Sequence, residues 1–193
     1  MTGDDDRALA TLPEPRGAAA IAAAGPTPYR IAFVCLGNIC RSPTAAVVMA
    51  QKLTDAGLSQ TIGVASAGTG DWHLGEQMDR RAAATLTAHG YDPSEHRATQ
   101  FDASWFDQHD LVLVMDQLNA RDVQAMARDE SDTSRIMMFR TFDPLVEDTL
   151  DVPDPWYSGD DSFAAVLAMV ERTCDALVDA LTARLEANGP DGR

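Results

Sequence analysis

Residues 31–49 read IAFVCLGNICRSPTAAVVM, and this stretch constrains the fold more than any other. Its first four residues are apolar and predict a buried strand. The residues from Ser42 onward predict a helix, with Pro43 at the position in the first turn that proline tolerates best. The loop at residues 35–41 therefore joins the end of a strand to the start of a helix. Such a loop turns backbone N–H groups toward one point, so the stretch predicts an anion site.

The residues in this loop suit the chemistry of phosphate. Gly37 and Asn38 tolerate the unusual backbone dihedrals that a tight anion loop needs. Arg41 offers a planar guanidinium that can bind two oxygens of one phosphate-like group. Cys35 faces the same site, where the loop N–H groups and Arg41 favour its thiolate. A thiolate beside an anion site is a nucleophile for phosphoryl transfer, so we expect Cys35 and Arg41 to be catalytic.

Length and charge narrow the possible functions. A chain of 193 residues suits one domain, and a hydrophobic content of 45% is sufficient for a core. The formal net charge of −15 argues against nucleic acid and anionic membrane surfaces as partners. The three cysteines, Cys35, Cys40 and Cys174, form an odd set with no disulfide framework, which is typical of a reducing compartment. We therefore expect a cytoplasmic protein.

Residues 1–28 differ in composition from the rest of the chain. They begin with an acidic run, Asp4 to Asp6, and are rich in Ala, Gly and Pro. They lack the basic start and the Leu- or Val-rich run of a conventional signal peptide. No apolar run in the chain reaches the roughly 18 to 20 residues of a membrane span. We expect a disordered leader at 1–28 and a short tail at 189–193, while export by an unconventional route stays open.

The order of expected elements predicts the fold class. Apolar runs predict strands at 30–34, 62–66, 111–115 and 136–139. Helices are expected between them and after the last, at 42–56, 79–89, 117–128 and from Ser162, with a short helical turn at 103–109. This alternation is typical of an open parallel α/β sheet with helices on both faces. Ligands of such sheets bind beyond the carboxyl ends of the strands, which is where Cys35 is expected.

The segment VCLGNICRSP, with the Asp-Pro pair of DVPDPWY at residues 151–157, resembles the active-site signature of the low-molecular-weight protein tyrosine phosphatases, particularly the bacterial ones. The resemblance covers residues 29–188, which we expect to form one phosphatase domain. It implies a single-domain, four-stranded sheet of order 2-1-3-4. It also implies hydrolysis of phosphotyrosine in a protein substrate through a phosphocysteine intermediate, with no cofactor. The spacing of His, Cys and carboxylate residues suggests no metal site.

A general acid is the further group that this chemistry needs. The tyrosyl leaving group has an ordinary pKa of about 10, so a thiolate expels it poorly without a proton donor. Asp154 is our candidate, because the flanking Pro153 and Pro155 stiffen its backbone. The resemblance implies that Asp154 protonates the leaving oxygen and then takes a proton from the attacking water. Asp151 is the nearby competitor, and we expect it to be solvated.

The resemblance assigns the rest of the loop to substrate binding or support. Asn38 would hold the loop in a strained shape, tied to Ser42 and to His96. Ser42 would hydrogen-bond the departing thiolate and also cap the following helix. The residues expected to bind substrate are Leu36, Gly37, Asn38, Ile39, Cys40 and Ser42. Cys40 would in addition form a reversible disulfide with Cys35 and protect the nucleophile from over-oxidation.

Three aromatic residues are expected to shape the substrate slot. The resemblance implies that Trp72 forms one wall, and that Trp156 and Tyr157 form another. A slot with aromatic walls admits phosphotyrosine and leaves phosphoserine too short to reach the thiolate. Tyr157 is also a possible target of a tyrosine kinase, which would make that kinase a partner.

Two other functions remain open at this stage. A class of thiol-coupled arsenate reductases shares this loop, but it relays a disulfide through a further pair of cysteines. Here Cys174 stands alone on an expected helix. The other alternative is a phosphotyrosine-binding module without catalysis. Such a module has no need of an acid at the position of Asp154.

Overall fold

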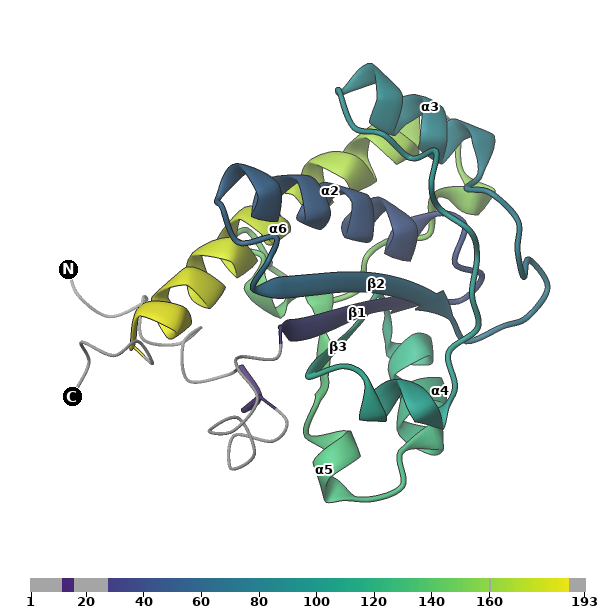
Figure 1. The fold of residues 1–193 in the computed structure, drawn as a ribbon. Coiled ribbons are helices and arrows are strands. Elements are labelled where there is room, and N and C mark those ends of the chain that lie inside the picture. Colours follow the sequence, from purple (N-terminus) through teal and green to yellow (C-terminus); the bar gives the residue numbers. More distant parts are fainter. Residues whose placement is uncertain (1–11, 16–27, 160, 188–193) are drawn as a thin grey trace.

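The structure is a computed structural model that describes residues 12–15, 28–159 and 161–187. Within these residues four parallel strands form one sheet, in the order β2-β1-β3-β4 (Figure 1). The strands are β1 (Tyr29–Cys35), β2 (Ile62–Gly68), β3 (Leu111–Val114) and β4 (Ile136–Met138). The expected open parallel sheet and its 2-1-3-4 order are confirmed. The chain runs from β1 to β2 on one side and then crosses back to β3 on the other side of β1. The carboxyl end of β1 is therefore the topological switch point of the sheet, where ligands bind in folds of this kind.

Helices cover both faces of the sheet, as the element order predicts. The helices α2 (Arg41–Asp55), α3 (Arg80–Ala88) and α6 (Asp161–Ala187) lie above the sheet in Figure 1. The helices α4 (Gln117–Met126) and α5 (Glu130–Thr133) lie below it. Short 3-10 helices occur at η2 (Ala103–Asp107), η3 (Phe139–Phe142) and η4 (Pro155–Tyr157). None of the helices in the described ranges is long and apolar enough to cross a membrane.

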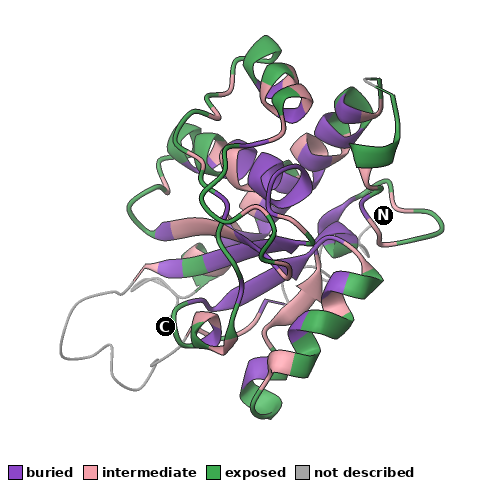
Figure 2. Cartoon of the chain, turned by 90° about the vertical axis from the view of Figure 1, so that its right-hand side faces the viewer, coloured by how far each residue is buried: buried purple, intermediate pink, exposed green. Residues whose placement is uncertain are grey.

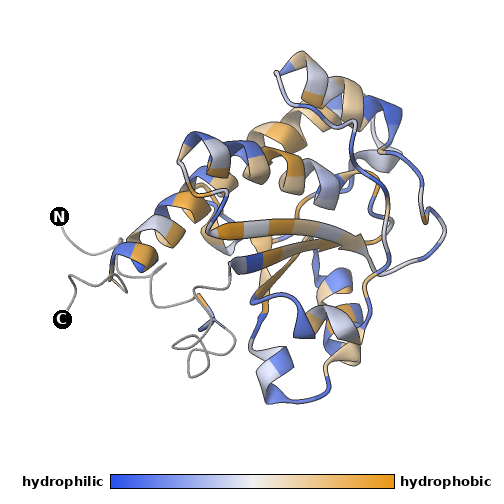
Figure 3. Cartoon of the chain, in the orientation of Figure 1, coloured by the Kyte–Doolittle hydropathy of each residue, from blue (hydrophilic) through white to orange (hydrophobic). Residues whose placement is uncertain are grey.

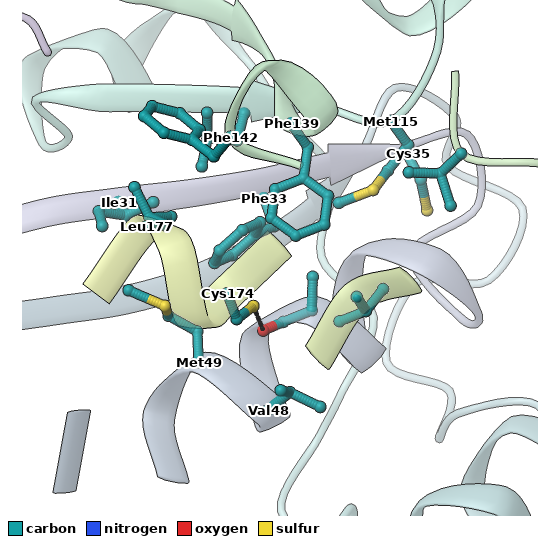
Figure 4. Packing of buried hydrophobic residues seen from close by; sticks show 14 of the residues in the cluster. Ile31, Phe33, Cys35, Val48, Met49, Met115, Phe139, Phe142, Cys174 and Leu177 are labelled. Carbon is teal, nitrogen blue, oxygen red and sulfur yellow. Dashed lines mark hydrogen bonds between the residues drawn. The ribbon is translucent and has the colours of Figure 1, made fainter. Parts of the chain in front are cut away.

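The core has one hydrophobic cluster on each face of the sheet. In the larger cluster, the rings of Phe33 and Phe139 meet edge to face, with centroids 5.4 Å apart (Figure 4). Cys174 of α6 is fully buried there, and its Sγ lies 3.9 Å from the carbonyl oxygen of Ala45. Burial and hydropathy coincide in the two central strands, since β1 and β3 are almost entirely buried and mostly apolar (Figures 2 and 3). Cys174 is thus a core residue.

Several local expectations need correction. The run at 136–139 was expected to be a buried strand, but β4 is only half-buried because it is the edge strand of the sheet. Helix α2 begins at Arg41, so Ser42 is not its cap. The short helix α5 was not expected, and it is initiated by the side chain of Asp129, which accepts a hydrogen bond from the N–H of Asp132.

Part of the expected disordered leader packs on the fold. Leu12 is only 6% exposed and joins the larger hydrophobic cluster. From α6, Arg184 donates to the carbonyl oxygen of Leu12 (2.7 Å) and pairs with the carboxylate of Glu14 (3.1 Å). The hydroxyl of Tyr29 donates to the carbonyl oxygen of Pro13 (3.2 Å). The composition of residues 1–28 as a whole does not reveal that the tetrapeptide at 12–15 packs on the fold.

The rest of the expected disordered leader, at 1–11 and 16–27, lies outside the described residues. The expected tail at 189–193 also lies outside them.

Candidate active site

The loop between β1 and α2 curls around the sulfur of Cys35. The N–H of Asn38 donates to Cys35 Sγ (3.3 Å), and the hydroxyl of Ser42 lies 3.0 Å from the same sulfur. Asn38 has a φ of 54° and is the only non-glycine residue of the described ranges in the left-handed region. Gly37 does not have a positive φ, so the loop needs a glycine there for space and not for backbone conformation. A Cβ at Gly37 would lie 3.1 Å from His73 Cδ2.

The side chain of Asn38 braces the loop from behind. Its Nδ2 donates to the hydroxyls of Ser42 and Ser66, both at 2.9 Å, and its Oδ1 accepts from the N–H of Thr99 (2.8 Å). His96 Nε2 lies 2.8 Å from the carbonyl oxygen of Asn38, so this nitrogen carries the proton. Burial lowers the pKa of His96 and favours the neutral ring. The structure brings Asn38, Ser42 and His96 together as expected, and adds Ser66 and Thr99, which sequence reasoning missed.

Ser42 faces inward and does not cap α2. The cap position belongs to Cys40, which makes no side-chain capping bond. The Ser42 hydroxyl accepts from Asn38 and lies 3.0 Å from Cys35 Sγ and 3.2 Å from the carbonyl oxygen of Ala67. A hydroxyl has one proton, so Ser42 can donate either to Cys35 or to Ala67.

Arg41 is buried, with 4% of its side chain exposed, and is held by two carboxylates. Its Nη1 lies 2.5 Å from Asp116 Oδ2 and 3.2 Å from the carbonyl oxygen of Val152, and its Nη2 lies 2.8 Å from Asp154 Oδ2. Burial alone would lower the pKa of Arg41. The negative charges of Cys35, Asp154 and Asp116 outweigh it and raise the pKa above its ordinary value. Arg41 is therefore a fixed cation at the base of the site.

Sequence reasoning missed Asp116. This residue follows β3 on the strand next to β1, and its Oδ1 also accepts from the N–H of Asn119 (2.7 Å) at the start of α4. A signal was available, because the first polar residue after a buried parallel strand lies at the ligand-binding edge of the sheet. Asp116 orients Arg41 while it caps a helix.

Asp154 lies at the same edge, on the loop before α6. Its Oδ2 pairs with Arg41, and its Oδ1 accepts from the N–H of Trp156 (3.1 Å) at the start of η4. Its competitor Asp151 does not line the cavity. Its carboxylate accepts from the N–H of Gln117 (3.0 Å), so Asp151 ties the loop to α4 and is not merely solvated.

These groups surround one cavity of about 290 Å³. Its lining residues are Cys35, Leu36, Gly37, Ile39, Cys40, Arg41, Trp72, His73, Asp154, Trp156 and Tyr157. All of the residues expected to bind substrate therefore line this cavity, except Asn38 and Ser42. These two residues are buried behind the loop. His73, to which sequence reasoning gave no role, is added. Its ring is tilted against that of Trp156, with centroids 6.1 Å apart, and its Nδ1 lies 2.8 Å from the carboxylate of Glu76.

Trp72 needs a glycine two residues before it. A Cβ at Gly70 would lie 1.7 Å from the indole ring of Trp72, inside its van der Waals surface. The absence of this atom allows the indole to fold back across its own loop toward the cavity. The N–H of Gly70 also donates to the carbonyl oxygen of Leu36 (2.9 Å), which ties the Trp72 loop to the anion loop.

A comparison with known proteins decides the family. The family model described as low molecular weight phosphotyrosine protein phosphatase matches residues 30–187. The chain belongs to this family. It is 44% identical over 159 residues to the low molecular weight protein-tyrosine-phosphatase of Streptomyces coelicolor, covering 82% of this chain and 96% of the relative. It is 42% identical over 164 residues to low molecular weight protein-tyrosine phosphatase A of Mycobacterium tuberculosis, covering 84% and 98% of the two chains.

Solved structures of phosphatases share the fold. The protein tyrosine phosphatase of Entamoeba histolytica with Hepes in its active site superposes with a TM-score of 0.76 at 30% identity, covering 80% of this chain and 97% of that one. Wzb of Vibrio vulnificus in complex with benzylphosphonate gives a TM-score of 0.68 at 25% identity, covering 78% and 97%. The expected family and enzyme class are confirmed, so this protein is a phosphatase.

The cysteines of this phosphatase are free thiols. Cys40 is buried and lines the cavity with Cys35. Burial raises the pKa of the Cys40 thiol, so this thiol stays protonated.

Across the described ranges, no three His, Cys, Asp or Glu side chains group as metal ligands.

Proposed function

We propose that this phosphatase hydrolyses phosphotyrosine in proteins by a metal-independent, two-step mechanism with a phosphocysteine on Cys35. The observation that carries this proposal is that the Cys35 thiol, the Arg41 guanidinium and the Asp154 carboxylate line one cavity. A nucleophile, an anion clamp and a proton donor are the three groups that the reaction requires.

In the first step, the phosphoryl oxygens bind the loop N–H groups and Arg41. These oxygens replace the Asp154 carboxylate on Arg41 Nη2, where it lies at 2.8 Å. Once away from this cation, the carboxyl group can face the leaving oxygen of the substrate. The Cys35 thiolate attacks phosphorus, the bond from phosphorus to the tyrosyl oxygen breaks, and Asp154 gives its proton to that oxygen.

In the second step, water replaces the thiolate on phosphorus. The Asp154 carboxylate takes a proton from the water, whose oxygen attacks the phosphoryl group, and the sulfur–phosphorus bond breaks. The leaving thiolate of Cys35 accepts hydrogen bonds from the N–H of Asn38 and the hydroxyl of Ser42. Ser42 would then turn its one proton from the carbonyl oxygen of Ala67 to the sulfur, which lowers the barrier to departure.

The aromatic residues give the preference for phosphotyrosine. Trp72, Trp156 and Tyr157 stand at the mouth of the cavity and can pack against a phenyl ring. The benzylphosphonate bound by the structural neighbour Wzb has the same combination of aryl ring and phosphoryl-like group, which supports this reading. Tyr157 is 88% exposed and is therefore accessible to a tyrosine kinase as a possible partner.

Two further expectations belong to this proposal. Residues 29–188 form the phosphatase domain, a range that the family match at 30–187 supports. The free thiols support a reducing, cytoplasmic site of action. A disulfide relay of the arsenate reductase kind gains no support, because Cys174 is buried in the core against Ala45.

The test compares initial rates in EDTA for the wild type, Cys35→Ser, Asp154→Asn and Asp151→Asn. We expect Cys35→Ser to be inactive and Asp154→Asn to lose roughly 10² to 10⁴-fold on a phosphotyrosine peptide. Asp151→Asn is the matched control, because Asp151 lies outside the cavity, and it should retain most activity. Turnover by Cys35→Ser, a wild type that requires added metal, or equal losses in the two Asp variants would contradict the proposal.

A further inference from the structure

The segment 143–154, called here the acid loop, carries Asp154 and contains no helix or strand. Long loops are mobile unless specific contacts hold them. Close to Asp154, the loop is held at Val152, whose N–H donates to the carbonyl oxygen of Met115 (2.7 Å) and whose carbonyl oxygen accepts from Arg41 (3.2 Å). Before Val152, the Asp151 carboxylate accepts from the N–H of Gln117 (3.0 Å), and the backbone carbonyls of the loop need a support of their own.

Arg140 supplies that support. It belongs to η3, just before the acid loop, and only 9% of its side chain is exposed. Its Nη1 donates to the carbonyl oxygens of Thr149 (2.9 Å) and Asp151 (3.0 Å). Its Nε donates to Asp143 Oδ2 (2.9 Å). One planar guanidinium therefore holds both the first residue of the acid loop and two carbonyls near its end.

Asp143 is shared with a second arginine. From α6, Arg172 donates to both carboxylate oxygens of Asp143, at 2.7 and 2.9 Å. The side chain of Asp143 is fully buried. Burial alone would raise the pKa of Asp143, but the hydrogen bonds from Arg172, Leu145 and Arg140 lower it below its ordinary value. The carbonyl oxygens of Thr149 and Asp151 accept from Arg140, whereas the hydrogen bonds described for Arg172 go to Asp143.

The carbonyl of Asp151 is close to the acid along a stiff backbone. It belongs to the peptide bond before Val152, and Pro153 and Pro155 fix φ on both sides of Asp154. A shift of the Asp151 carbonyl therefore also moves the N–H of Val152, which shares its peptide bond, and it reaches Asp154 through Val152 and Pro153. We propose that Arg140 is a positioning residue for Asp154, acting through its hydrogen bonds to the carbonyls of Thr149 and Asp151. This inference rests on the proposed role of Asp154 as the general acid.

The inference predicts that the rate comes to depend more strongly on the leaving group, an effect that a loss of stability alone does not cause. A misplaced acid slows the expulsion of a poor leaving group such as phenolate, which needs the proton. It has little effect on p-nitrophenolate, which leaves without one. The quantity to measure is the ratio of kcat/KM for phenyl phosphate to kcat/KM for p-nitrophenyl phosphate, in one preparation. The fraction of folded enzyme cancels in this ratio, so a merely structural role for Arg140 leaves it unchanged.

The variants are Arg140→Lys and Arg140→Met, with Arg172→Lys as matched control and Asp154→Asn as reference. Lysine keeps a charge beside Asp143 but lacks the planar fork that reaches Asp143 and two carbonyls together. We expect Arg140→Lys to lower the ratio about tenfold, and Arg140→Met at least as much. Arg172→Lys loses part of the same ion pair but none of the carbonyl contacts, so its ratio should match the wild type. Asp154→Asn should give the largest fall.

Each outcome has a distinct meaning. An unchanged ratio in Arg140→Lys, with a fall in Asp154→Asn, overturns the inference and leaves the proposed function intact. An unchanged ratio in Asp154→Asn overturns the proposed acid itself. An equal fall in Arg172→Lys shows that the ion pair with Asp143, and not the carbonyl contacts, holds the loop, which also overturns the inference. If Arg140→Met does not fold, Arg140→Lys alone decides.

Discussion

A Cβ at Gly68 would lie 2.7 Å from the carbonyl oxygen of Leu36. Gly68 ends β2 and pairs with Cys35 across the sheet, so the last residue of the strand touches the backbone of the anion loop. The neighbouring N–H of Thr69 donates to the carbonyl oxygen of Cys35 (2.9 Å). The shape of the anion loop thus depends on the absence of a side chain at the end of the adjacent strand.

Gly68→Ala should damage the site more than the fold. The added methyl group meets backbone atoms that cannot move aside without displacing the loop. We expect kcat/KM for an aryl phosphate to fall roughly 10 to 100-fold, and the free energy of unfolding to fall by roughly 1–3 kcal/mol. Gly63→Ala, in the same strand, is the control, because a Cβ there would only meet Arg30 Cγ at 3.5 Å. Equal activity in the two variants would contradict this account of the loop.

His96 should make stability depend on pH. Burial lowers its pKa, while the unfolded chain takes up a proton on this side chain near its ordinary pKa of about 6.5. Acid therefore favours the unfolded state. The contribution of neutral His96 is complete above about pH 7 and is lost as the pH falls through about 6.5 toward the lowered pKa of the folded state.

The variant His96→Gln isolates this contribution, because glutamine keeps an N–H donor for Asn38 and does not titrate. Between about pH 7.5 and about pH 5.5, the wild type should lose up to about 1 kcal/mol more unfolding free energy than His96→Gln. Urea unfolding at the two pH values measures the difference. Identical losses in both proteins would show that His96 does not supply the dependence.

Cys40 should make oxidation of the enzyme reversible. Peroxide oxidises the Cys35 thiolate to a sulfenic acid, and the Cys40 thiol then condenses with it to form a disulfide and release water. Wild-type activity should return on addition of a dithiol. In Cys40→Ser, the sulfenic acid can proceed to the sulfinic acid, so most activity should be lost permanently. Cys174→Ala should behave like the wild type, and full recovery of Cys40→Ser would rule out Cys40 as the resolving thiol.

The packed leader tetrapeptide should contribute to stability without affecting catalysis. Leu12→Ala removes a buried side chain from the larger core cluster, at a cost of about 2 kcal/mol. For a protein of this size the melting temperature should fall by roughly 4–8 °C, with turnover of a small aryl phosphate unchanged. Leu118→Ala is the control, since Leu118 is exposed on α4. A melting temperature equal to that of the control would show that the tetrapeptide does not stabilise the fold.

The sequence predicts the features that local patterns encode. The buried strand β3 follows from its run of apolar residues, and the end of α2 follows from Gly57, which has a φ of 72°. Asp154 stands out because two prolines flank it. The strand order came from the resemblance to a family, because the lengths and spacings of four parallel strands fit several orders.

Contacts between distant segments could not be predicted in this way. The sequence can place Asp116 at the ligand-binding edge of the sheet, but not its pairing with Arg41, 75 residues away, and Ser66 lies 28 residues from Asn38. These pairs meet only because the register of the parallel strands places them at one edge. His73 was missed for a similar reason, since its place in the cavity depends on how the loop after β2 folds against Gly37. A single sequence carries no direct signal of such distances.

The most direct test of the account is to trap the phosphoenzyme. The wild type is mixed with a phosphotyrosine peptide, quenched rapidly with denaturant, and digested for mass spectrometry. The account predicts one phosphoryl group on the peptide that contains Cys35, bound to its sulfur, and none in Cys35→Ser. Steady turnover with no phosphoryl group on Cys35, or with the group on another residue, would contradict it.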